Sequence, residues 1–332
     1  MENISADSAG HSGFRFSGRA GEYFSIWIVN ILLSIVTFGI YSAWAKVRRK
    51  RYFYGCTTLD GSCFEYLAEP KRILIGRIIV FSLYTVWIGV SKLAPVFSVV
   101  LLIPLALFIP VIINKALKFN AYNTSYRNVR FYYQSSYKET LYVFVLLGAL
   151  SAITLGIMFP YYVYRIKKHI IEHSRYGLQH FHFSGRPGRF YSIYIGVAVI
   201  AVCMTIAGAA MIKVIPLLVP FIWILGYAFA TTHLYVSQTN YIFDNVRLRD
   251  IKFRSTMNSS GYFLIAAVNY FVIALTLGLM IPWAKIRITR YRLENMAVLA
   301  GSSLDSFAAE EFAQVGATGE EFSDFFDFDM GL

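Results

Sequence analysis

Residues 214–237 read VIPLLVPFIWILGYAFATTHLYVS, a stretch of 24 residues without Lys, Arg, Asp or Glu. A second uncharged stretch of 21 residues, APVFSVVLLIPLALFIPVIIN, occupies positions 94–114. An apolar run of about 18 residues is long enough for a helix that crosses a membrane. Five further apolar segments lie at about 23–45, 73–90, 141–164, 190–212 and 262–284. The sequence therefore predicts an all-α polytopic membrane protein.

The composition supports this class. Hydrophobic residues make up 57% of the chain, against about 45–50% in soluble domains, and the mean hydropathy is +0.52. Residues 1–22 are polar and lack a cleavable apolar signal, so we expect direct insertion with the N-terminus retained. The cysteines Cys56, Cys63 and Cys203 have neither disulfide-framework nor zinc-site spacing. We therefore expect no metal and no cofactor.

Charge is segregated along the chain. The 332 residues contain 31 Lys and Arg and 19 Asp and Glu, but eight of the acids fall in 305–332, which has no Lys or Arg. In a membrane protein, a basic remainder indicates orientation by positive loops and contact with anionic lipids rather than nucleic acid. The acidic, aromatic tail predicts a disordered segment that docks on a protein partner or on the chain's own basic surface, or only aids solubility.

Internal repeats organise the apolar segments. Segments two to four recur as segments five to seven at an offset near 120, for example as TLG at 154–156 and again at 276–278. The first segment, with TFG at 37–39, is an extra copy of the third element. We expect two tandem three-segment repeats plus one extra N-terminal segment. The predicted regions are a disordered N-terminus (1–13), a first membrane segment with a basic interfacial helix (14–72), membrane repeat 1 (73–180), membrane repeat 2 (181–304) and the disordered tail (305–332).

Three long runs resemble a known family. They are TFGIYSAWAKVRRKRYFYG at 37–55, NVRLRDIKFRST at 245–256 and TLGLMIPWAKIRITRYRLEN at 276–295. Over roughly residues 14–307 the chain resembles the YjgN family of bacterial inner-membrane proteins. The resemblance implies an inner-membrane location but, for a domain of unknown function, no catalytic or ligand residues. Ser42-Ala43 replaces the family's usual proline before Trp44, so that break depends on Gly39.

The Thr-x-Gly elements combine glycine and proline inside apolar stretches, which ends one helix and starts another. The predicted structural breaks are Gly39, Gly156, Pro160, Gly278 and Pro282. Each break is followed by a basic stretch typical of an interfacial helix.

Two topologies follow from these breaks. If all seven segments span, the basic residues divide 17 against 13 between the two sides. If the Thr-x-Gly segments enter and return, only Lys92 and Lys213 lie outside and the division becomes 28 against 2. The positive-inside rule favours the second topology. The second topology also places four alternating runs, which we predict to be short β segments, on one membrane-facing soluble side. They lie at 14–16, 129–133, 179–183 and 249–254.

Polar residues inside membrane segments are candidate ligand contacts. Asn30 precedes Thr37 by seven residues, and Asn269 precedes Thr276 by seven. Seven residues are about two helical turns, so each pair shares a helix face. These residues bind a polar solute or ion, or they form hydrogen bonds between helices.

Arg48, Arg165 and Arg287 hold equivalent positions after the three breaks. They are candidate contacts for anionic lipid or an anionic solute. The alternative role is an orientation anchor whose head group reaches the membrane interface.

One pattern suggests enzymatic chemistry. His169, Glu172 and His173 fit the His-x-x-Glu-His pattern of some zinc proteases. Equivalent positions in the other elements lack it, and the flanking Lys167 and Lys168 disfavour a dication. No other catalytic motif is present in the sequence, so we expect neither a catalytic residue nor an enzyme.

Two functional classes remain. Inverted repeats around a central site would indicate transport or permeation of a small solute. Parallel repeats would indicate a membrane scaffold whose basic cytoplasmic face binds anionic lipid or an acidic partner protein. We take transport as the first interpretation and the scaffold as its alternative.

Overall fold

The structure is a computed structural model that describes residues 11–300 and 304–323. Ten short strands close into one barrel in the order β1-β10-β9-β8-β7-β6-β5-β4-β3-β2. The strands are β1 (His11–Phe16), β2 (Thr57–Leu59), β3 (Ser62–Tyr66), β4 (Thr124–Tyr126), β5 (Val129–Tyr133), β6 (Ser174–Tyr176), β7 (Gln179–Phe183), β8 (Val246–Leu248), β9 (Ile251–Ser255) and β10 (Met296–Leu299). The prediction of an all-α protein with a few short β segments on one membrane-facing soluble side is therefore wrong. Strands of three to six residues are too short to give a clear alternating pattern.

Tight turns and helical hairpins alternate along the barrel. Two-residue turns join four pairs of antiparallel strands: β2 and β3, β4 and β5, β6 and β7, and β8 and β9. In each pair, the last residue of the first strand lies opposite the first residue of the second strand. Asp60 and Gly61 (φ 47° and 75°) and Arg127 and Asn128 (φ 48° and 63°) adopt left-handed backbone conformations. Such pairs match the twist of short β-hairpins.

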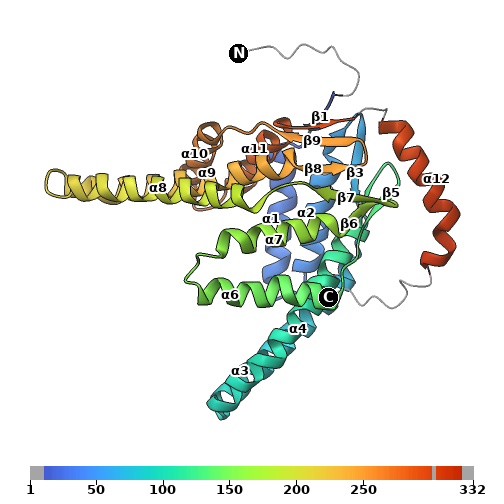
Figure 1. The fold of residues 1–332 in the computed structure, drawn as a ribbon, viewed down its shortest axis with the longest axis horizontal. Coiled ribbons are helices and arrows are strands. Elements are labelled where there is room, and N and C mark those ends of the chain that lie inside the picture. The colour runs from blue at the N-terminus through green and yellow to red at the C-terminus, as the bar shows by residue number, and fades with distance from the viewer. Residues whose placement is uncertain (1–10, 301–303, 324–332) are drawn as a thin grey trace. The chain divides into compact units, whose positions relative to one another are not determined.

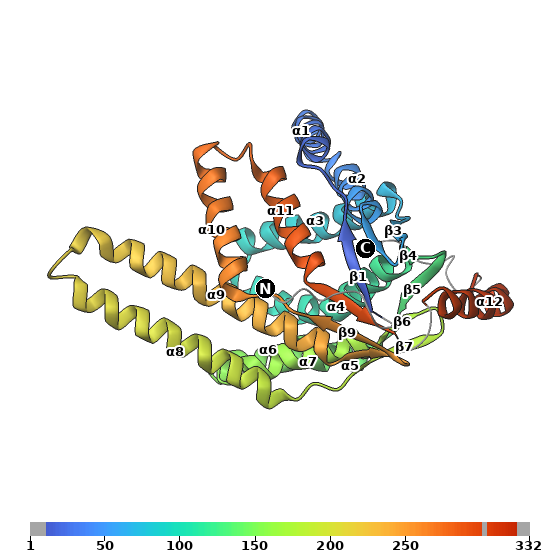
Figure 2. The same cartoon turned by 90° about the horizontal axis from the view of Figure 1, so that it is seen from above.

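The remaining connections are five helical hairpins (Figure 1). They are α1 (Ala20–Val36) with α2 (Ser42–Gly55); α3 (Pro70–Leu93) with α4 (Pro95–Tyr122); α5 (Tyr137–Thr140), the π-helical η1 (Leu141–Leu146) and α6 (Leu147–Ile153) with α7 (Phe159–Glu172); α8 (Pro187–Met211) with η2 (Pro216–Leu218) and α9 (Val219–Asp244); and α10 (Ser259–Leu275) with α11 (Ile281–Glu294). Figure 2 shows α10 and α11 running side by side in opposite directions.

One backbone hydrogen bond recurs at the base of every helical hairpin. The amide of the residue after the odd strand donates to the carbonyl of the residue before the even strand. The five bonds are Ser17 N to Cys56 O (2.9 Å), Leu67 N to Asn123 O (2.8 Å), Gln134 N to His173 O (3.0 Å), Ser184 N to Asn245 O (3.0 Å) and Thr256 N to Asn295 O (2.9 Å). Residues 11–299 therefore consist of five copies of a strand–helical hairpin–strand unit.

This fivefold repeat corrects the predicted two repeats plus one extra segment. The offset near 120 spans two units, because Leu67 and Ser184 are equivalent, as are Gln134 and Thr256. The extra N-terminal segment is the first unit itself. Counting only apolar segments hid the shorter period, because the strands that begin and end each unit were not included.

Contacts divide the chain into two compact units, Met1–Phe16 with His182–Gly301, and Ser17–Phe181 with Ser302–Leu332. In the first unit, Val236 packs against Met257 and Met296. In the second, a cluster of Ala43, Val47, Tyr66, Ala68 and Ile73 joins α2 to β3 and the start of α3. Each core therefore lies where helical hairpins meet strands.

Two of the five hairpins are long enough to cross a membrane. Among the described residues, four helical stretches have the required length and apolar composition, namely Pro70–Leu93, Val96–Tyr122, Pro187–Met211 and Pro216–Asp244. At 1.5 Å per residue, the 24 residues of α3 extend about 36 Å, against about 30 Å of hydrocarbon. α1 and α10, with 17 residues each, are shorter.

Where the sequence predicts a disordered tail, the structure describes a helix, α12 (Leu304–Ser323). Asp305 lies 2.6 Å from the guanidinium of Arg127. Glu311 is 1% exposed and accepts a hydrogen bond from the Leu178 backbone amide (2.9 Å). α12 is thus held on two β-turns of its own unit. The residues after Ser323, and the predicted N-terminal segment before His11, lie outside the described residues. A protein partner for the tail stays a prediction.

Candidate functional site

The threonines of the Thr-x-Gly elements are part of the turns that end their helices. The Thr37 hydroxyl donates to the Leu33 carbonyl (2.7 Å) and accepts from the Tyr41 amide (2.9 Å). The Thr276 hydroxyl makes the equivalent bonds to the Val272 carbonyl (2.7 Å) and the Met280 amide (3.3 Å). Both hydroxyls therefore stabilise backbone within the hairpin.

The two asparagines are buried on short helices of different units. Asn269 Nδ2 donates to the carbonyl of Ala284 at 3.3 Å, which ties α10 to α11. Asn30 lies on α1, and its backbone carbonyl accepts from the Ser34 hydroxyl at 2.6 Å. For Asn269, the contact is the interhelical hydrogen bond that the sequence left open as the alternative to a solute site.

The predicted breaks adopt one shared geometry. Gly39, Gly156 and Gly278 have φ of 90°, 85° and 92°, a region that favours glycine because a side chain there is strained. Pro160 and Pro282 are each the second residue of the helix that follows. The residues before the glycines are almost fully exposed: Phe38 by 98%, Leu155 by 94% and Leu277 by 95%. Each short hairpin therefore presents an apolar side chain at its tip.

The three arginines lie on the return helices of their own hairpins. Arg48, on α2, is exposed. The guanidinium of Arg165 lies 5.8 Å from the centre of the Tyr142 ring, and that of Arg287 lies 5.2 Å from the Trp283 ring. These are cation–π distances. The contacts suit side chains at the headgroup level.

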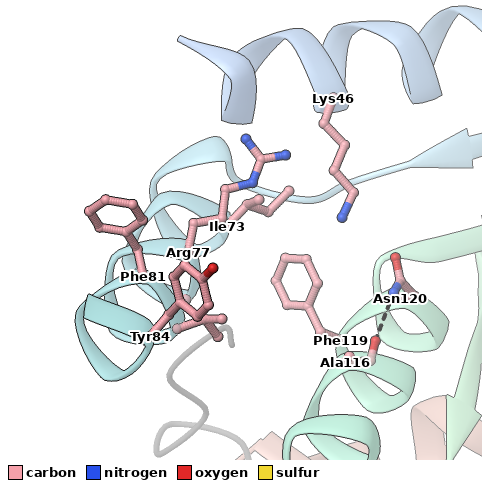
Figure 3. Close-up of a pocket in the computed structure, with 10 residues that line it drawn as sticks. Lys46, Ile73, Arg77, Phe81, Tyr84, Ala116, Phe119 and Asn120 are labelled. Carbon is pink, nitrogen blue, oxygen red and sulfur yellow. Dashed lines mark hydrogen bonds between the residues drawn. The ribbon is translucent and has the colours of Figure 1, made fainter. Parts of the chain in front are cut away.

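A pocket of about 490 Å³ lies where α2, α3 and α4 meet (Figure 3). Its lining residues are Lys46, Ile73, Gly76, Arg77, Val80, Phe81, Tyr84, Ala116, Phe119 and Asn120. Figure 3 shows the ends of Lys46 and Arg77 above the rings of Phe119 and Tyr84. The pocket thus has a cationic part and an apolar wall, and none of the ten lining residues is acidic.

Cations are concentrated beside this pocket. Burial, reinforced by Arg77 and Arg49, lowers the pKa of Lys46. Burial, with Lys46 and Arg49 nearby, lowers the pKa of Lys50 to about 8. The Lys50 ammonium donates to Asn120 Oδ1 at 2.7 Å. Like charges held together in a partly buried place are stabilised by an anion that binds between them.

One signal for this pocket is visible in the sequence. Arg77 is a charged residue inside an apolar segment, which marks a functional candidate by default. Its closeness to Lys46 could not be predicted, because 31 residues and two strands separate the two side chains in the chain. Phe119 and Asn120 are brought in only when α4 returns to the barrel.

The long apolar hairpins, the interfacial basic helices and the barrel at their base define a multi-pass membrane protein. A family described as "Bacterial protein of unknown function (DUF898)" matches residues 11–325, and the chain belongs to this family. It is 26% identical over 365 residues to "Inner membrane protein YjgN" of Salmonella typhimurium, covering 90% of this chain and 91% of the relative.

Proteins of the same name in two strains of Escherichia coli, O157:H7 and K12, are 34% identical over 154 residues, covering 46% of this chain and 38% of each relative. No solved structure matches the chain. The relatives confirm the predicted family and the multi-pass location in the bacterial inner membrane.

Proposed function

We propose that the protein is a membrane scaffold that binds anionic phospholipid in the pocket between α2, α3 and α4. The observation that carries the proposal is the joint presence of Lys46 and Arg77 above an apolar wall of Phe81, Tyr84 and Phe119. A phosphate headgroup matches the cationic part and an acyl chain matches the wall. Such basic pockets between membrane helices suit lipid headgroups on the cytoplasmic side.

The arrangement of the hairpins supports this position in the bilayer. Every helical hairpin begins and ends on neighbouring strands, so all its ends lie at the barrel. Lys92 and Lys213, at the tips of the long hairpins, would alone reach the opposite side. The positive-inside rule then puts the barrel and its basic helices in the cytoplasm.

The short hairpins fit shallow insertion. On each return helix the first cation follows only four to six helical residues: Lys46 on α2, Arg165 on α7 and Lys285 on α11. At 1.5 Å per residue the tips extend about 6–9 Å beyond that cation. This matches the depth of about 5–10 Å reached by interfacial helices.

Solute transport, the first interpretation from the sequence, depends on inverted repeats around a central site. All five units have the same element order, and each hairpin starts and ends on neighbouring strands of the barrel. This geometry favours the scaffold. That the protein is no enzyme and binds no nucleic acid are likewise predictions.

Lipid retention by the full-length protein in detergent tests the proposal. We expect Lys46→Gln with Arg77→Gln to weaken phosphatidylglycerol binding about thirtyfold, since each cation near a membrane contributes about 1 kcal/mol. Lys71→Gln with Arg72→Gln is the matched control, because it removes the same charge from exposed positions on α3 outside the pocket. Native mass spectrometry of the retained lipid gives the readout.

Two further results decide the outcome. Phosphatidylcholine should bind no better to the wild type than to the pocket variant. Soluble glycerol phosphate should not displace phosphatidylglycerol, because it leaves the apolar wall unfilled. If the pocket double variant and the control double variant lose the same amount of phosphatidylglycerol binding, the overall positive charge rather than this pocket holds the lipid. That result would contradict the proposal.

A further inference from the structure

Tyrosine hydroxyls close the base of three helical hairpins. Tyr52 Oη, on α2, accepts from the Arg19 amide (2.8 Å) and donates to the Arg19 carbonyl (3.0 Å). The same pair of bonds joins Tyr241 to Arg186 (2.6 and 3.3 Å) and Tyr291 to Asn258 (3.1 and 3.1 Å). In each case the return helix is fastened to the residue at which the outgoing helix begins.

The third hairpin has His169 at this position, four residues before the base hydrogen bond. Its Nε2 lies 3.0 Å from the Ser135 hydroxyl and 3.4 Å from that of Thr140, so its contacts are to side chains instead of the backbone. The ring is buried, and an imidazole nitrogen is a common ligand for metal ions.

His173 holds a position that is asparagine in three other hairpins. There, Nδ2 of Asn123, Asn245 or Asn295 donates to the carbonyl four residues earlier (2.7–2.8 Å). His173 Nδ1 does the same with the His169 carbonyl at 2.8 Å. A carbonyl only accepts, so Nδ1 carries the proton. Nε2 therefore faces Glu139 Oε2, 2.9 Å away.

We propose that Glu139, His169 and His173 bind a divalent transition metal ion of the Zn²⁺ type. One ligand atom from each residue lies within 4.8 Å of the other two. Zinc binds nitrogen and oxygen at about 2.0–2.2 Å, so its ligand atoms lie about 3–4 Å apart. Small movements of the three side chains would bring their ligand atoms from the present spacing of up to 4.8 Å to the spacing that zinc requires. Two histidines and a glutamate form a known zinc set that leaves a fourth position for water.

The ion would replace the tyrosine bridge found in three of the other hairpins. Glu139 lies on α5 at the start of the outgoing arm, and both histidines lie at the end of the return arm. The hydrogen bond from His173 Nδ1 to a carbonyl is the outer-shell contact that fixes a ligand's orientation. Glu172, the glutamate of the sequence pattern, lies 3.7 Å from Lys168 instead. The ligand set therefore differs from the protease pattern.

Cobalt and zinc titration of the full-length, chelator-treated protein in detergent tests this site. We expect one equivalent of Co²⁺ to give the visible absorption of a four-coordinate N/O site, and Zn²⁺ to displace it. Glu139→Gln and His173→Gln should each weaken binding at least tenfold. Glu172→Gln and His180→Gln are the matched controls, and both should bind as the wild type does.

A second variant separates lost binding from lost folding. His169→Tyr restores the residue found in three other hairpins, so it should elute as the wild type does on size exclusion yet bind no Co²⁺. Zinc should raise the melting temperature of the wild type and leave that of His169→Tyr unchanged. If the wild type binds no Co²⁺ at millimolar concentration, or if Glu139→Gln binds as the wild type does, Glu139 and His173 form an ion pair only and the proposal is overturned.

Discussion

The two long helical hairpins and the three short ones share a base but differ at the tip. The backbone hydrogen bond at the base is 2.8 Å in α3/α4 and 2.9 Å in α10/α11. The tip of a long hairpin carries Lys92 or Lys213, whereas a short hairpin presents Phe38, Leu155 or Leu277. In the proposed topology, one repeated unit both crosses the membrane and enters its surface, by a change of length and tip charge.

The largest effect is expected from disrupting a long hairpin. Glycines let membrane helices approach closely, and a Cβ at Gly208 on α8 would collide with the indole of Trp223 on α9. Gly208→Leu should lower the free energy of unfolding by about 2–3 kcal/mol through overpacking. Denaturant unfolding in detergent measures it. Gly196→Leu, on the same helix with nothing within 4 Å, is the control and should change little.

The stability of a short hairpin depends instead on the backbone conformation of its turn. Gly278 has φ 92°, so Gly278→Ala should lower the free energy of unfolding by about 1–2 kcal/mol through backbone strain. Gly89→Ala, in the long hairpin helix α3 with open space around it, should be neutral or stabilising. Thermal unfolding of the two variants compares them. Equal destabilisation would show that the turn geometry does not distinguish the hairpins.

The tyrosine hydrogen bonds at the base are the same in a long and a short hairpin, so removing them should lower the free energy of unfolding equally. Tyr241 belongs to a long hairpin and Tyr291 to a short one, and each hydroxyl makes two backbone hydrogen bonds. Tyr241→Phe and Tyr291→Phe should each cost about 1 kcal/mol of unfolding free energy. A difference larger than about 1 kcal/mol between the two would contradict a common base.

The smallest effect concerns pH at the pocket beside α3/α4. Because burial lowers the pKa of Lys50 to about 8, its positive charge is present below that pH and lost above it. Phosphatidylglycerol retention should therefore decrease as pH rises from 7 to 9.5, by less than about fivefold. A bound phosphate would raise the pKa and move the decrease to higher pH. Lys50→Arg should remove the decrease, and its persistence there would exclude Lys50 as the cause.

Sequence patterns predicted features that are local. The long apolar runs marked the helices that are long enough to cross a membrane, and Thr-x-Gly marked turns in which Gly39 and Gly278 adopt positive φ. The barrel was missed because strands as short as Thr57–Leu59 give too few alternating residues, and closure depends on pairings distant along the chain.

The candidate sites were harder to predict, for a related reason. Glu139 lies 30 residues before His169, so the pattern around the histidines pointed to Glu172 instead. Lys46 and Arg77 meet only because α2 and α3 pack together. Both sites are assembled by helices that return to the barrel, which single-sequence periodicity does not report.

The accessibility of the hairpin ends tests most directly whether every helical hairpin returns to a barrel on the cytoplasmic side. In a chain whose cysteines are replaced, single cysteines are placed by Lys92→Cys and Lys213→Cys at the long tips, and by Ser174→Cys and Ser255→Cys at the barrel. Intact cells are treated with a membrane-impermeant thiol reagent, with lysed cells as the control. The fivefold barrel predicts labelling of the two long tips from outside, and of positions 174 and 255 only after lysis. Labelling of Ser174→Cys in intact cells would show that the short hairpins span the membrane, and would contradict the account.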